Sequence, residues 1–118
     1  MWRRLDDPDL LERYRGEHHA YATPAVIAAA LADLAGRDWA SRTWVVTSLG
    51  KMRFTTASSY RDVDAHGAVF IGQTGERDFV VFYVKAGARE GEVSASCTDA
   101  NLSEVVAKMV DEHLLAGT

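Results

Sequence analysis

The sequence predicts an α+β fold, a five-stranded antiparallel meander with two N-terminal helices and one C-terminal helix packed on the sheet. Residues 68–86 contain two apolar runs around a polar, glycine-containing turn, which is typical of an antiparallel hairpin. Residues 101–114 carry apolar side chains at helical spacing behind an asparagine that can begin a helix. Because 118 residues suffice for one core, we expect a single domain over residues 1–118.

Two helices are expected before the sheet. Asp7 can cap the first helix, and Pro8 suits its opening position because a proline there loses no hydrogen bond. Thr23 and Pro24 repeat this signal and begin a second helix that ends near residue 35. Alanines occupy much of the second helix, so we expect it to pack closely between neighbours or at an interface.

Five strands are expected between the helices. Residues 43–49 are rich in β-branched side chains, and residues 51–57 alternate between apolar and polar ones. The hairpin follows with arms at 68–73 and 79–84, and the last strand spans 91–98. The second hairpin arm is apolar without alternation, so we expect both of its faces to be covered.

One face of this sheet is expected to point away from the helices. Its outward positions mix polar and aromatic side chains, namely Arg53, Thr55, Tyr83, Lys85, Glu92, Ser94 and Ser96. If the helices cover the opposite face, Phe79, Val81 and Tyr83 stay partly uncovered, and the first helices, a partner or a ligand must shield them. This conflict with two-sided burial makes the outward face the expected place for function.

No motif for metal or cofactor chemistry stands out. His18 and His19 are adjacent, and neighbouring side chains on a helix diverge, so the pair is not expected to hold one ion. Residues 62–67 resemble the start of a calcium loop, but Gln73 stands where the bidentate glutamate belongs. We interpret them as a turn before the hairpin. We therefore expect neither a metal nor a cofactor.

The single cysteine is not expected to act as a nucleophile. Cys97 falls on the inward side of an alternating strand, where a thiol usually behaves as a small apolar group. No Gly-x-Ser-x-Gly segment is present either. Acyl transfer on a serine or cysteine therefore has no support in the sequence.

Composition narrows the choice of partners. A net charge of −4 and an isoelectric point near 5.5 argue against nucleic acid, because its binding proteins usually carry a basic face. No segment is long and apolar enough to cross a membrane, and the start of the chain lacks the apolar region of a signal peptide. We expect a cytoplasmic protein that binds neither nucleic acid nor membrane.

Five residues are candidates for a ligand or interface site. Trp39 lies in a polar connection, where an exposed tryptophan is typical of an interface anchor, although it fits a lid over the sheet edge equally well. Arg53, Tyr83 and Lys85 would supply the polar groups of a pocket between helices and sheet. His66 would serve as a base in such a pocket.

The favoured hypothesis is a small non-enzymatic protein-interaction domain of a chaperone, immunity or adaptor kind. It would bind a protein partner or itself, as a homodimer, because the chain combines a two-sided apolar strand and an alanine-rich helix with no catalytic constellation. A small-ligand-binding protein or modest enzyme with a pocket between helices and sheet is the alternative. A structural component of a larger assembly is a third possibility.

Overall fold

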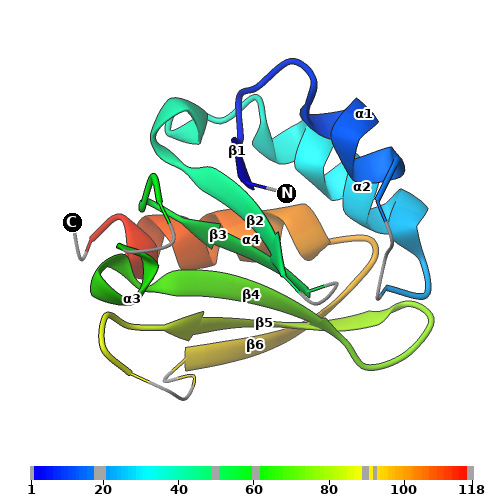
Figure 1. Ribbon diagram of the computed structural model, residues 1–118. Coiled ribbons are helices and arrows are strands. Elements are labelled where there is room, and N and C mark those ends of the chain that lie inside the picture. Colours follow the sequence, from blue (N-terminus) through cyan, green and yellow to red (C-terminus); the bar gives the residue numbers. More distant parts are fainter. Residues whose placement is uncertain are drawn as a thin grey trace.

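The computed structural model describes residues 2–17, 21–48, 51–59, 62–88, 91 and 93–116, and these form an α+β fold (Figure 1). Each strand pairs with its neighbour in sequence, and every pairing is antiparallel. The predicted class and the meander are confirmed. The strands are β1 (Trp2–Arg4), β2 (Trp44–Ser48), β3 (Lys51–Thr55), β4 (Ala68–Gln73), β5 (Asp78–Val84) and β6 (Val93–Thr98).

The described sheet has six strands rather than five because β1 joins its edge. Trp2 lies opposite Val46, and Arg4 lies opposite Trp44. A run of three residues that includes two arginines gives no strand signal in a sequence, so β1 was not predicted. The pairing with β2 and the complete burial of Leu5, directly after the strand, fix β1 in place.

The helices gather on one face of the sheet, called the inner face below. Both predicted N-terminal helices and the closing helix are present, and α2 and α4 lie behind the sheet in Figure 1. Among the described residues, no helix combines the length and apolar character needed to cross a membrane. The helical elements are α1 (Leu10–Arg15), α2 (Pro24–Leu34), η1 (Ala40–Arg42), α3 (Val63–His66), α4 (Leu102–Met109) and η2 (Val110–Leu114).

Strand β5 is apolar on both faces, as predicted, but the two faces were assigned the wrong way round. Phe79 and Val81 lie on the inner face and are buried. Tyr83 shares that face, because it pairs with Val69, which is fully buried. Phe82 instead points to the opposite, outer face and is half-buried. The error arose because strand alternation cannot be carried through the turn from β4 to β5 without knowing the register.

The segment before β4 contains the short helix α3 where a simple turn was expected. It ends at Gly67, whose φ of 76° favours glycine. A Cβ on Gly67 would lie 2.8 Å from the carbonyl oxygen of Val84, so a side chain there would press against β5. The Thr55 hydroxyl donates to the Gly67 carbonyl at 2.9 Å and closes the loop.

A tyrosine completes the ladder between the two central strands. The Tyr21 hydroxyl donates to the Ile71 carbonyl and accepts from the Met52 N–H, both at 2.8 Å. Met52 and Ile71 are the last paired positions of β3 and β4 at this end, so Tyr21 satisfies main-chain groups where the ladder stops. Burial raises the pKa of Tyr21 to about 12.

The closing helix forms as predicted, but the expected capping box does not. Asn101 makes no side-chain bond to the first turn of α4; its Oδ1 atom accepts from the Thr98 N–H at 2.9 Å, at the end of β6. After α4 the helix continues through one π-helical turn, η2, in which the Leu115 N–H donates to the Val110 carbonyl. The link between β2 and β3, residues 49–50, lies outside the described residues.

Candidate interaction surface

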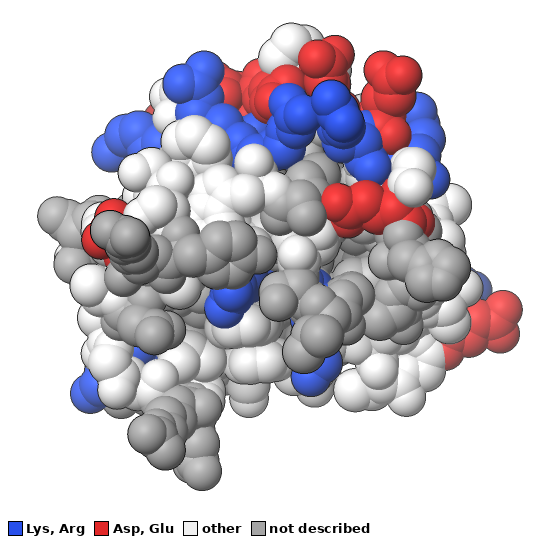
Figure 2. All heavy atoms as spheres, viewed as in Figure 1, with Lys and Arg blue, Asp and Glu red and all other residues white. Residues whose placement is uncertain are grey.

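Three side chains from neighbouring strands form a stacked row on the outer face. Arg53 lies opposite Phe70, which lies opposite Phe82. The two phenylalanine rings are 3° from parallel with centroids 5.1 Å apart, and the Arg53 guanidinium carbon lies 5.8 Å from the Phe70 centroid. All three side chains are half-buried. The row therefore presents aromatic area on the outer face, where the described surface is largely uncharged below the charged upper margin (Figure 2).

A small cavity brings two of the sequence candidates together beside this row. It measures about 40 Å³ and is lined by Arg53 and Lys85, among others. The Arg53 Nε atom is buried and has no hydrogen-bond partner among the described residues. The cavity is far smaller than the roughly 300–1,000 Å³ typical of small-molecule sites. Two cationic side chains thus meet at a space that holds little more than water.

His66 lies near this cavity but serves a local contact. It ends α3, is half-buried, and its Nδ1 atom lies 2.9 Å from the Thr56 hydroxyl. This contact ties α3 to the residue directly after β3. His66 itself is not among the residues that line the cavity.

Tyr83 and Trp39 do not join the other candidates. Tyr83 lies on the inner face and stacks on His113, with ring centroids 5.5 Å apart, so it cannot share a pocket with Arg53 on the outer face. Trp39 is only 3% exposed, which contradicts the interface-anchor interpretation. The Thr43 hydroxyl donates to the Trp39 carbonyl, holding the connection around η1 against the core. The lid interpretation agrees with this burial.

The edge formed by β6 was missed as a feature by sequence reasoning. Within the described ranges β6 has a paired strand on one side only, β5, and Ser94 and Ser96 are exposed. Val93 is 36% exposed and is the one exposed large apolar side chain of the described residues. A groove of about 180 Å³ runs beside this edge on the inner face, lined by Val93, Ala95, Val105, Lys108, Met109, Glu112 and His113.

The signal for this edge was present in the sequence. The residues of β6 read Val-Ser-Ala-Ser-Cys-Thr, with no charge and no proline, the two features that usually protect an exposed edge. The phenylalanine row was detectable only with the register, because Phe70 and Phe82 face outward together through their pairing. Alternation within one strand assigns relative faces, but not which face the helices cover.

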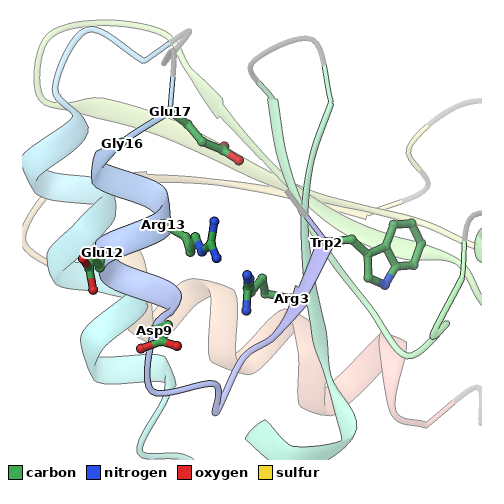
Figure 3. A pocket seen from close by; sticks show the side chains of 7 residues that line it. All are labelled: Trp2, Arg3, Asp9, Glu12, Arg13, Gly16 and Glu17. Atoms are coloured by element: carbon green, nitrogen blue, oxygen red, sulfur yellow. The ribbon is translucent and has the colours of Figure 1, made fainter.

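The opposite edge, at β1, is bordered by a charged cleft. Figure 3 shows α1 beside β1, with Arg13 and Arg3 extending from these two elements toward one another. The cleft measures about 670 Å³, and Glu17 lines it as well. The Arg3 guanidinium also donates to the Asp7 carboxylate at 2.9 Å. The hydrogen bond to Asp7 from the Asp9 N–H, and then Arg3, lower the pKa of the Asp7 carboxyl.

Other reactive groups do not gather into a site in the part of the chain that the structure describes. Cys97 is 7% exposed, and burial raises the pKa of its thiol. No three histidine, cysteine or acidic side chains converge among the described residues; the His18–His19 pair lies outside them. Comparisons of the chain with protein-family models, curated proteins and solved structures give no match.

Proposed function

We propose that this chain is a small, cytoplasmic, non-enzymatic interaction domain that associates with a second copy of itself. One observation carries the proposal: β6 is a neutral, exposed edge strand with half-buried or exposed apolar side chains on both sides of it. Phe82 flanks the edge on the outer face, and Val93 lies on the inner face. An unprotected edge of this kind is a template for pairing with another chain.

The remaining surface supports this choice over a catalytic one. The cavity that gathers Arg53 and Lys85 is too small for a metabolite, and Tyr83 lies on the other face of the sheet. His66 is engaged with Thr56 rather than directed at a shared pocket. These placements remove the arrangement on which the ligand-site alternative was first based.

A single observation keeps a ligand site as the second candidate. The buried Arg53 Nε lacks a partner among the described residues and lies next to a second cation, Lys85. A small anion could satisfy such a pair, because a guanidinium donates to carboxylate and phosphate oxygens. Opening the 40 Å³ cavity would require α3 to move away from the sheet.

The deciding experiment for the proposed function is the oligomeric state. Size-exclusion chromatography with light scattering and native mass spectrometry should show a mass approaching two chains as concentration rises through the micromolar range. One chain has a mass of 12.9 kDa. A mass of one chain at every concentration contradicts the proposal.

A thermal-shift assay with inorganic phosphate and small carboxylates tests the second candidate. If a site at Arg53 exists, one of these anions raises the melting temperature of the native protein but not of Arg53→Ala. Lys51→Ala is the matched control, because Lys51 is an exposed cation on the same strand. If no anion shifts the native protein, the ligand-site candidate is excluded for these classes of compound.

A further inference from the structure

The alternation of the β5–β6 ladder determines which main-chain groups of β6 point outward from the sheet. The Asp99 N–H donates to the Arg77 carbonyl at 3.0 Å, directly beyond the Asp78–Thr98 pair. Because hydrogen-bonded and non-bonded pairs alternate in an antiparallel ladder, Thr98 is a non-bonded position toward β5. By the same alternation, Ser94 and Ser96 also direct their N–H and C=O groups to the free edge.

The outward groups of Thr98 are already bonded within the chain. Its N–H donates to Asn101 Oδ1 at 2.9 Å, and its carbonyl accepts from the Asn101 N–H at 3.3 Å. No described residue bonds the outward groups of Ser94 and Ser96. Within β6, the edge therefore offers two donors and two acceptors, alternating along two exposed serines.

We propose that the partner is a second copy of the chain, whose β6 pairs antiparallel with the first across a two-fold axis at Ala95. Ser94 of each copy then lies opposite Ser96 of the other, and the outward N–H and C=O groups of both serines are bonded. This inference rests on the proposed function and specifies its surface and register. Two six-stranded sheets become one continuous sheet.

The neighbouring registers fit worse. An axis at Ser96 would oppose Ser94 to Thr98, whose outward groups are occupied by Asn101. An axis at Ser94 would oppose Ser96 to residue 92, which precedes β6. Only the axis at Ala95 matches two unoccupied serines to two unoccupied serines within the strand, and this self-match favours a second copy over an unrelated peptide.

The side chains agree with this pairing. On the inner face, Val93 of one copy is placed opposite Cys97 of the other, so the exposed valine gains apolar cover and the two grooves merge. No charged residue lies in β6, and the groove contributes Lys108 and Glu112, one charge of each sign. Thus the contact is electrically neutral although each chain carries −4, and added salt should not weaken association.

A pair of charge variants tests the surface. Ser94→Lys/Ser96→Lys opposes lysine to lysine at both positions and should raise the dimer dissociation constant at least tenfold. Ser94→Lys/Ser96→Glu opposes lysine to glutamate at both positions and should restore the dimer. Both serines are exposed, so circular dichroism and the melting temperature of the monomer should stay close to the native values. Equal dimerisation by the two variants overturns the proposal.

A cross-link tests the register. Ala95 opposite Ala95 is a non-bonded pair with Cα atoms about 4.5 Å apart, within the range that a disulfide spans. Ala95→Cys in a Cys97→Ser background should therefore form a disulfide dimer with oxidised glutathione. Ser96→Cys in the same background should not, because its counterpart is Ser94.

The outcomes separate this inference from the proposed function. A native dimer that resists the lysine pair and gives no Ala95→Cys cross-link associates through another surface; the proposed function then stands and the β6 pairing fails. A native protein that stays monomeric at every concentration overturns both. Loss of the dimer with the lysine pair, recovery with the lysine–glutamate pair and the selective cross-link together establish the pairing.

Discussion

The two edges of the sheet end in opposite ways. At β1 the edge is three residues long, carries two arginines and lies beside α1 across a charged cleft (Figure 3). At β6 the edge is six residues long, neutral and exposed at Ser94 and Ser96. Short length, charge and a covering helix are the means by which proteins prevent edge pairing. The chain uses all three at β1 and none of them at β6.

The contrast is sharper because side chains elsewhere complete the unpaired main chain. Tyr21 bonds the groups of Met52 and Ile71 where the β3–β4 ladder ends. Asn101 bonds both outward groups of Thr98 at the end of β6. Against this background the outward groups of the two β6 serines are the exception, and an exception of this kind favours an interface over chance exposure.

The largest expected effect compares anchoring at the two edges. Leu5 is fully buried directly after β1, so Leu5→Ala should lower the free energy of unfolding by about 2–5 kcal/mol. Val93→Ala at the other edge should cost only about 0.5 kcal/mol in the monomer, because Val93 is 36% exposed. Urea unfolding in the Ser94→Lys/Ser96→Lys background measures both without a contribution from association. Comparable losses in the two variants would refute the contrast.

The fold was predictable from the sequence to the extent that its signals are local. Pro24 at the start of α2, the polar turn before β5 and the apolar spacing of α4 each depend on a few consecutive residues. Strand β1 was missed because its stability depends on the distant β2 and on burial of Leu5. Asn101 was assigned to the helix rather than to Thr98 because a capping residue reads the same in sequence whichever side it bonds.

The candidate site was less predictable, since it depends on register. Arg53 and Lys85 do meet, but Tyr83 turned out to lie on the other face because pairing with Val69 directs it inward. Trp39 stands among polar neighbours in sequence and is nevertheless buried. Long-range packing decides such placements, and it leaves no mark in a short window of sequence.

A smaller effect is expected where a side chain takes the place of a strand partner. Tyr21→Phe leaves the Met52 N–H and the Ile71 carbonyl unpaired in the interior, so it should lower the free energy of unfolding by about 1–3 kcal/mol. Chemical denaturation at neutral pH measures the loss. A variant as stable as the native protein would show that the hydroxyl is not needed to end the ladder.

The same tyrosine predicts a pH dependence. Its pKa rises from 10.0 to about 12 on folding, so its contribution is fully present below pH 10 and is lost as the pH rises from 10 toward 12. The shift corresponds to about 3 kcal/mol. The stability gap between the native protein and Tyr21→Phe should therefore narrow over this interval in urea titrations. A gap that stays constant through it contradicts the assignment of the raised pKa to Tyr21.

The smallest expected effect concerns the residue that ends the free edge. Asn101→Ala releases the Thr98 N–H and should lower the free energy of unfolding by about 0.5–1.5 kcal/mol. Its consequence for pairing is more informative, because a partly released Thr98 can pair with Ser94 of a second copy and admit the register centred on Ser96. Dimerisation should then persist while the Ala95→Cys disulfide yield falls. Asn101→Asp, which keeps an acceptor oxygen, should retain the native yield. If Asn101→Ala leaves that yield unchanged, the side chains of β6 rather than its occupied main-chain groups determine the register.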